Sequence, residues 1–341
     1  MHFRKIVVSA AIVLTSAAAA LAQDAAEWAK VTAAAKTEGK VVFYSGLVGS
    51  PSTAAIARAF EKKYGITAEF LDLRISEIRE RMRAEQIAGR VIGDVLTTSY
   101  NVTTSIENNE GYIQPLKPFP SKSRVREGSK IDNPTGTQVP VYMLKYGILV
   151  NTRLVTPADE PKSWADLVDP KWNGKILADD PRALGGGFNA FVAQHDKLGV
   201  DFLKKLADQK LTFSRDFRES EKRTARGEFP VYAPFLFNDY SSLRGLPIKA
   251  VVPMEGVAYV QFVASMIKNA PHPNAALLFI DFLLSDEAQV ILATEGLGAA
   301  IDGIDSKIPD DLRPLVTAKE MGTADWRREA QLLQLAKDIF K

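Results

Sequence analysis

The stretch KVVFYSGLVGSPSTAAIARAFEKKYGITAEFLDL, residues 40–73, decides the fold. It opens with a short run of β-branched and aromatic residues that stops at a glycine, which is typical of a buried strand. Pro51 suits the first turn of a helix, Ile56 and Phe60 fall on one face of that helix, and Gly65 suits its C-terminal cap. A second apolar run follows directly. The stretch therefore predicts a strand, a helix and a second, parallel strand.

The following residues continue this first unit. A helix is predicted over residues 76–87 with Ser76 as its N-cap, and GDVLTTS at 93–99 is predicted to be the third strand. The arginines of this helix alternate with glutamates, which indicates a solvated surface rather than an anion site. The inward face of the helix is predicted to hold Ile78, Met82 and Ile87.

The same plan recurs later in the chain. Strands are predicted in GKILADD (174–180), LTFSRDF (211–217) and FPVYAPFLF (229–237), with helical segments between them. Strands that alternate with helices through short links pair in parallel with right-handed crossovers. The predicted fold class is therefore α/β, with two doubly wound lobes.

The predicted domain boundaries follow from these two units. Extended segments near 139–146 and 249–256 are expected to cross between the lobes and to form a hinge. Helical patterns at 274–293 and 310–341 are expected to return to the first lobe. The parts are a signal peptide at 1–22, lobe 1 at 24–138 and 251–300, lobe 2 at 139–250, and a C-terminal helical segment at 301–341 that packs on the lobes.

The N-terminus and the composition indicate an exported protein. A basic start, a short apolar run and a small-residue motif that ends at Ala22 predict a secretory signal peptide cleaved near that residue. Cleavage would remove Arg4 and Lys5 and lower Lys+Arg from 43 to 41, equal to the 41 Asp+Glu. A neutral chain lacks the positive field of a nucleic-acid binder, and a chain without cysteine relies on burial rather than disulfides. A free periplasmic protein is expected.

The candidate binding residues lie at the carboxyl ends of predicted strands, where open α/β sheets bind their ligands. If the strand order is 2-1-3, the loops after the first and third strands flank one mouth. Glycines there let the backbone approach a ligand, and each helix start offers free N–H groups to a negatively charged oxygen. The residues in these positions are Ser45, Gly46, Ser99 and Tyr100 in lobe 1, and Arg182, Gly185, Gly186, Asn238, Asp239 and Tyr240 in lobe 2.

Each of these positions has a structural alternative. The turn before Pro51 is equally consistent with an ordinary serine-capped helix. Arg182 is as well suited to pair with Asp179 or Asp180 at the surface as to grip a ligand. Tyr240 is equally suited to pack at the edge of its lobe.

Three motifs carry a resemblance to a known family. They are PKSWADLVDPKWNGKI at 161–176, HPNAALLFIDFLLSDEAQ at 272–289, and VVFYSG followed by AFEKKYG in the opening stretch. Ser163 and Asp166 in the first motif also form a capping box by themselves. With these motifs the chain resembles the periplasmic solute-binding proteins of ABC importers, in the extracellular family 1 branch that includes the ferric-iron-binding proteins. The resemblance implies a type II binding-protein fold, hinge closure around a small-molecule solute, and an ABC permease as partner.

The metal chemistry of that branch carries over poorly. Ferric-binding relatives use two neighbouring tyrosines in the loop matched by FNDYSSL at 237–243, and only Tyr240 stands here. Their usual first-lobe ligands are also missing from the loops after the first and third strands. An oxygen-rich substitute site remains the alternative, because Fe(III) prefers anionic oxygens. Its members are Tyr100, Asp239, Tyr240 and Glu255.

We expect the solute to be a small anionic or polar organic molecule, because the synergistic-anion site of the relatives maps to the glycine-led helix start at 183–188. An enzyme is the rival class. The mature chain has no Cys and only two histidines, His195 and His272, which suit turn and cap positions better than a nucleophile and base pair. No cofactor or resident metal, no nucleic acid and a monomeric state are expected.

Overall fold

The computed structural model describes residues 25–118 and 124–341. The predicted signal peptide at 1–22 lies outside the described residues. A helix over 25–38 precedes the first strand. None of the helices in the described part of the chain has both the length and the apolar character needed to span a bilayer.

The first lobe is a parallel α/β unit. Its elements are β1 (Lys40–Ser45), α2 (Pro51–Tyr64), β2 (Thr67–Asp72), α3 (Ile75–Ile87), β3 (Val95–Ser99) and α4 (Tyr100–Glu110). β1 pairs in parallel with both β2 and β3, so the predicted order 2-1-3 is confirmed. The helix signals of the opening stretch also hold, because Ser50 caps α2 and Gly65 ends it with φ of 69°.

The third helix ends at Ile87 as predicted, but its N-cap and the burial of Ile87 differ from the prediction. α3 begins at Ile75 with Arg74 as its N-cap, so Ser76 lies inside the first turn. Ile78 is buried as expected, but Ile87 is 73% exposed. The reason is geometric, because nine residues at about 100° per residue place Ile87 half a turn away from Ile78.

A glutamate takes the inward place near the end of that helix. Glu85 is buried, and its carboxylate accepts hydrogen bonds from the hydroxyl of Tyr44 at 2.6 Å and from the Nε of Arg81 at 3.0 Å. It also accepts the backbone N–H of Ile92 at 3.0 Å. The end of α3 is therefore held to β1 by a satisfied polar group rather than by an apolar one.

The second lobe repeats the plan of the first. Its elements are β6 (Ile176–Asp179), α5 (Gly186–Ala207), β7 (Thr212–Ser214), α6 (Phe217–Arg226), β8 (Val231–Leu236), the 3₁₀ helix η5 (Phe237–Leu243) and β9 (Ile248–Val251). β6 pairs in parallel with β7 and β8. The short 3₁₀ helix η3 (Ala165–Val168) precedes β6, and the predicted capping box of Ser163 and Asp166 forms there with two N–H···O bonds of 3.0 Å.

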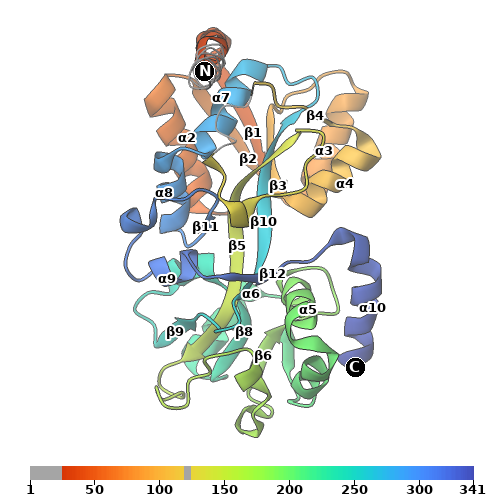
Figure 1. The fold of residues 1–341 in the computed structure, drawn as a ribbon, viewed down its shortest axis with the longest axis vertical. Helices are drawn as coiled ribbons and strands as arrows, with labels where there is room; N and C mark the ends of the chain where they lie inside the picture. Colours follow the sequence, from red (N-terminus) through yellow and green to blue (C-terminus); the bar gives the residue numbers. More distant parts are fainter. Residues whose placement is uncertain (1–24, 119–123) are drawn as a thin grey trace, which may run out of the picture.

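Two long antiparallel strands join the lobes (Figure 1). They are β5 (Gln138–Asn151) and β10 (Val257–Ile267). β10 pairs with β3 in the first lobe and β5 pairs with β8 in the second, so one sheet runs in the order β2-β1-β3-β10-β5-β8-β6-β7. The first predicted crossing, at 139–146, is confirmed. The second was placed too early, because residues 248–251 form β9 beside β5 and the crossing strand is β10.

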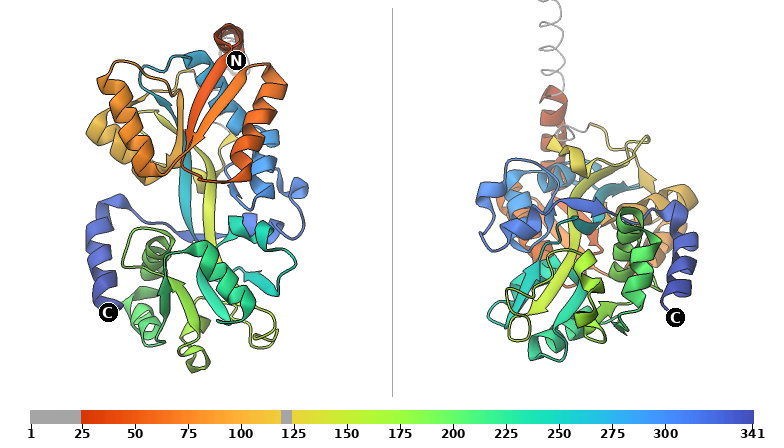
Figure 2. Two further views of the ribbon diagram at one scale, coloured as in Figure 1. Left: turned by 180° about the vertical axis from the view of Figure 1, so that it is seen from behind. Right: turned by 60° about the horizontal axis from the view of Figure 1, so that its bottom comes forward.

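The C-terminal part of the chain returns to both lobes. α7 (Pro273–Leu283) and α8 (Asp286–Thr294) pack on β1 and α2, and Ser285 caps α8 as predicted. After α9 (Arg313–Val316) and β12 (Glu320–Gly322), α10 (Glu329–Ile339) lies along α5 of the second lobe, as both Figure 1 and Figure 2 show. Residues 310–341 therefore do not return to the first lobe as a whole.

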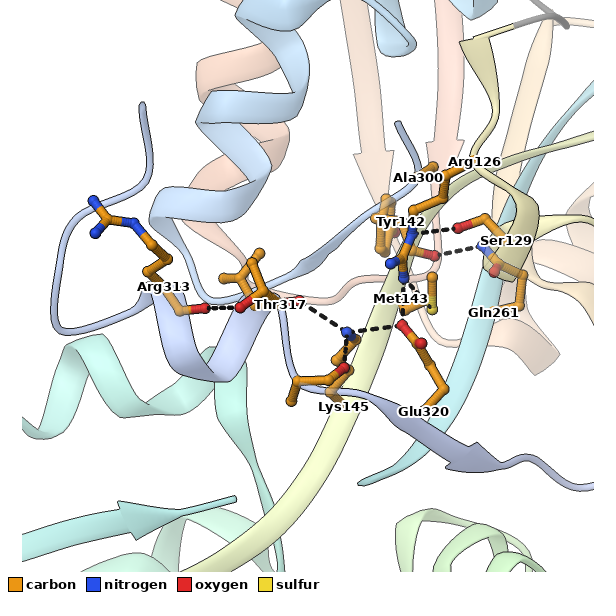
Figure 3. A network of polar contacts seen from close by, with 12 residues as sticks. Arg126, Ser129, Tyr142, Met143, Lys145, Gln261, Ala300, Arg313, Thr317 and Glu320 are labelled. Atoms are coloured by element: carbon orange, nitrogen blue, oxygen red, sulfur yellow. Dashed lines mark hydrogen bonds and ion pairs between the residues drawn. The ribbon is translucent and has the colours of Figure 1, made fainter. Parts of the chain in front are cut away.

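A buried ion network ties this C-terminal segment to the hinge (Figure 3). Lys145 on β5 is 0% exposed, and its Nζ donates to the carbonyls of Val316 at 2.8 Å and Ala318 at 2.6 Å. The same Nζ lies 2.9 Å from Glu320 on β12, and Arg126 binds that carboxylate from the other side. Burial lowers the pKa of Lys145 to about 8, although Glu320 offsets part of this shift.

Candidate functional site

The ends of β1 and β3 hold the first group of predicted site residues. Ser45 is buried, and its Oγ accepts the N–H of Leu47 at 3.2 Å. A Cβ added to Gly46 would lie 2.7 Å from the side chain of Ile75 and 3.1 Å from Oγ1 of Thr98. Close packing within the first lobe therefore favours a glycine at position 46, although the nearest atom is the movable end of the Ile75 side chain.

A carboxylate of the chain itself lies beside the turn before α2. Asp72, the last residue of β2, lies close to the hydroxyls of Ser45 and Thr53 and to the N–H of Gly49. Burial raises the pKa of Asp72, and these hydrogen-bond donors offset part of the rise. The N–H groups of Ser52 and Thr53 at this helix start donate to Ser50, so the structural alternative of a serine-capped helix applies, with Asp72 lying beside the turn before it.

A carboxylate of the chain also lies at the start of α5. The N–H of Gly187 donates to the carboxylate of Asp179, which ends β6. A Cβ on Gly187 would overlap the carbonyl of Asp179, and a Cβ on Gly186 would lie 2.7 Å from the ring of Tyr146. Gly186 and Gly187 thus permit a close approach of α5 to β5 and β6, whereas a Cβ on Gly185 would meet only Oδ2 of Asp179, at an ordinary 3.9 Å. Burial raises the pKa of Asp179 to about 6, against the N–H of Gly187, which lowers it.

The start of η5 places the next predicted residues beside two unpredicted carboxylates. Asn238 Nδ2 lies 3.2 Å from Oδ1 of Asp239, and both residues are partly exposed. Burial and the neighbouring Asp239 raise the pKa of Glu221 on α6, and burial also raises the pKa of Asp239. Asp179, Glu221 and Asp239 are called the acidic cluster below.

Tyr240 packs at the edge of the second lobe, as the structural alternative for this residue predicted. Its ring packs nearly perpendicular to that of Phe235, with 6.4 Å between the ring centres. It is partly buried against the core that includes Phe235 and Leu243. This contact explains Tyr240 as an aromatic residue at the edge of the lobe.

Tyr100 lies in a different place from Tyr240. Its hydroxyl donates to the carbonyl of Asp132 at 2.8 Å, and it lines a cavity of about 440 Å³ between α4, β10 and the segment that follows β12. Much of the polar lining of this cavity is paired within the chain. Arg327 binds Asp325 through two nitrogens, at 2.8 and 3.0 Å, and Asn101 donates to the carbonyl of Ala324 at 2.9 Å. Ser99 is the N-cap of the helix that begins at Tyr100.

Two further predicted residues have structural roles. Arg182 grips Asp180 through Nε and Nη2, both at 2.8 Å, and its guanidinium carbon lies 4.6 Å from the ring centre of Phe213. This pair lowers the pKa of Asp180. Glu255 accepts the N–H groups of Trp164 at 3.1 Å and Ala165 at 3.2 Å, so it caps η3. The alternative metal set is not brought together, because Tyr100 and Glu255 are held elsewhere.

Five buried or partly buried acidic and tyrosine side chains at this site were not predicted from the sequence. Asp72 and Asp179 end strands, Glu221 lies on the buried face of α6, and the phenols Tyr146 and Tyr232 lie within β5 and β8. A signal was available for two of them, because Asp72 and Asp179 both end predicted strands at the ligand-binding edge. Glu221 gave no such signal, since it belongs to a strongly charged helix that resembles a solvated surface.

Comparison with known proteins identifies the family. Residues 104–327 match the family described as bacterial extracellular solute-binding protein. An uncharacterised protein of Haemophilus influenzae is 26% identical over 311 residues, which cover 87% of this chain and 84% of the relative.

Solved structures share the fold at low sequence identity. The substrate-binding protein of an ABC transporter from Agrobacterium tumefaciens superimposes with a TM-score of 0.69 at 18% identity, covering 89% of this chain and 94% of that one. The Trichodesmium protein IdiA (FutA), solved with iron and citrate, gives a TM-score of 0.72 at 18% identity, covering 88% and 99%. At this identity the similarity concerns the fold and leaves the solute open.

Proposed function

Because the chain belongs to the bacterial extracellular solute-binding proteins, the substrate-binding proteins of ABC transporters, we propose that it captures a small solute between its two lobes and presents it to a membrane permease. Closure of the lobes about β5 and β10 buries the solute. The protein acts in the periplasm as a monomer, after export with cleavage near Ala22.

One observation carries this proposal. Two α/β units turn the carboxyl ends of their parallel strands toward each other, and β5 and β10 connect them through a single sheet (Figure 2). The units come close on the side of α2 and α6, where a Cβ on Gly49 would lie 3.5 Å from Nη2 of Arg218. Ligands of open α/β sheets bind at such strand ends, so a solute held there contacts both lobes.

We place the solute at the strand ends rather than in the cavity beside Tyr100. Ser45 and Ser99 end the strands of the first lobe, and Asn238 and Asp239 follow β8 in the second. A ferric site built from Tyr100, Asp239, Tyr240 and Glu255 is disfavoured, because Glu255 caps η3. An anionic solute is disfavoured by the carboxylates near the two helix starts, Asp179 at α5 and Asp72 beside the turn before α2.

Catalysis is not part of the proposal. The family and the fold are those of transport binding proteins. Nδ1 of His195 lies 2.8 Å from Asp196. His272 immediately precedes α7, and its Nδ1 lies 2.9 Å from Asp94. Both histidines thus have local structural partners.

The test is a solute screen followed by small-angle scattering. A panel of amines, amino acids, carboxylates, phosphates and ferric complexes is first screened for a rise in melting temperature of the full chain, because a ligand at 100 times its Kd stabilises by about 2.7 kcal/mol. Any solute that raises the melting temperature should also reduce the radius of gyration. A stabilising solute that leaves the radius of gyration unchanged at saturation would contradict closure.

A further inference from the structure

The three carboxylates of the acidic cluster come from three elements and surround Tyr232, although they do not meet closely enough to form a metal-binding group. Asp179 ends β6, Glu221 lies on α6, and Asp239 lies in η5. Asp179 and Glu221 are only 5% and 3% exposed, whereas Asp239 is partly open to solvent. Burying several carboxylates together is costly unless a positive charge compensates them. Arg218 and Arg215 lower the carboxylate pKa values only in part, and within the described residues none of the three carboxylates forms an ion pair within 4 Å.

A buried phenol points at the same place and has no partner. Tyr232 pairs with Leu177 in the sheet, so Asp179, two residues further along β6, projects from the same face as Tyr232. Tyr232 is 1% exposed, and its hydroxyl makes no hydrogen bond to any described residue. Burial and the nearby charges of Asp179 and Glu221 raise the pKa of Tyr232.

The other unpaired atoms at this place are acceptors. Oε1 of Glu221 and Oδ1 of Asn238 are buried without a hydrogen-bond partner among the described residues. An amide oxygen can only accept, and a phenol oxygen can accept as well as donate. Burial and Asp239 raise the pKa of Glu221 above neutral, so without a cation Glu221 keeps a proton that it shares with Asp239, and a bound cation would let it ionise and accept. The unmet demand is therefore for hydrogen-bond donors, in a region whose formal charge is negative.

We propose that the solute presents a positively charged nitrogen group with several N–H donors, such as an ammonium, amidinium or guanidinium, to the acidic cluster. Its charge compensates Asp179, Glu221 and Asp239, and its N–H groups satisfy the free oxygens of Glu221 and Asn238. This inference rests on the proposed function and names the solute class for it. A bare metal ion fits less well, because the described residues contain no group of three or more His, Cys, Asp or Glu arranged to hold a metal.

The test compares cationic and anionic probes on the full chain. Putrescine, agmatine and lysine are titrated by calorimetry against succinate, inorganic phosphate and ferric citrate. At least one of the three cations should bind, and Asp239→Asn should weaken that binding about 10- to 100-fold, the range for loss of a charged hydrogen bond. Glu221→Gln provides a second variant in case the first folds poorly.

A matched control comes from the same helix. Glu219 is exposed on α6 and pairs with Arg226, so Glu219→Gln removes one negative charge without touching the acidic cluster. Its affinity for the cation should equal that of the wild type. Equal weakening by Glu219→Gln and Asp239→Asn would overturn the inference, since only general charge would then matter.

The outcomes separate the two proposals. Binding and compaction with succinate, phosphate or ferric citrate, but with none of the cations, would overturn the cationic solute and leave the binding function intact. Binding of a cation without compaction would support the acidic cluster as its site and contradict lobe closure. Failure of all three cations to bind would overturn the inference.

Discussion

At the scale of single residues, the notable feature is the pair of aspartates near the two helix starts. Asp72 and Asp179 each end a parallel strand, and Asp179 lies against the start of α5 while Asp72 lies beside the turn before α2. Backbone N–H donors stabilise a negative charge at both, but burial opposes them and raises both pKa values. The chain thus buries carboxylates, at a cost in folding stability, at the edge of the sheet where solutes bind.

The cost at Asp179 can be measured with Asp179→Asn. The folded-state pKa of about 6 lies above the ordinary 3.8, so folding favours the protonated form and is penalised as pH rises through this interval. The neutral amide escapes the penalty and keeps an oxygen for the N–H of Gly187. In urea unfolding at pH 8 the variant should gain about 1–3 kcal/mol, and the gain should shrink toward pH 4.

The adjacent aspartate is the control for that measurement. Arg182 lowers the pKa of Asp180, so the sign is reversed and Asp180→Asn should lose stability at pH 8. Asp179→Asn would disagree with this interpretation if it destabilised the protein equally at both pH values.

Single-residue roles were predictable where the partner is local in sequence. Ser50, Gly65 and the box of Ser163 and Asp166 act within a few residues, and the structure confirms them. The role of Glu255 was not predictable, because its partners at 164–165 are brought to it only by the fold.

At the scale of elements, the C-terminal strand β12 completes the hinge. It runs parallel to β10, and Glu320 on β12 lies between the buried Lys145 of β5 and the guanidinium of Arg126 (Figure 3). Two cations therefore share one carboxylate at the point where the lobes join. Such a buried pair is sensitive to the loss of one partner.

Glu320→Gln should destabilise the protein by about 1–3 kcal/mol at pH 7, because Lys145 must then either give up its proton or stay charged without a partner beside Arg126. The pKa of Lys145, already lowered to about 8, should fall further, so the loss should diminish above pH 9. Urea unfolding at both pH values measures this. Glu160→Gln is the control, because its partner Lys249 is exposed and the loss should stay below about 1 kcal/mol. Equal losses in the two variants would contradict the role of the network.

Element types were predictable from period and turn residues, whereas ends and directions were less so. The alternation of apolar runs and amphipathic helices located the strands of both lobes. The inward position predicted for Ile87 was wrong because nine residues at about 100° each already place it on the face opposite Ile78. The second hinge strand was placed too early, because β9 and β10 form one nearly continuous apolar stretch in the sequence.

At the scale of the whole molecule, the two lobes share a sheet and a core. The largest cluster of buried apolar residues contains Val41 and Phe43 of the first lobe as well as Leu177 and Phe235 of the second. The architecture was predictable because two alternating units with two extended crossings allow few other arrangements. The acidic cluster was not, because it needs the relative placement of β6, α6 and η5.

This continuity predicts cooperative unfolding. Without solute, scanning calorimetry should show one transition, with equal calorimetric and van't Hoff enthalpies, because neither lobe can lose β5 or β10 alone. Two resolved transitions would show that the lobes unfold separately despite the shared sheet.

The position of β10 between β3 and β5 also determines when the molecule can fold. During synthesis, the edge of β3 that pairs with β10 stays unpaired until residue 267 of 341 has left the ribosome. Pairing over such a long separation is slow, so most of the nascent chain emerges before its first lobe can close. Such late folding fits the export in an unfolded state that the proposed function requires.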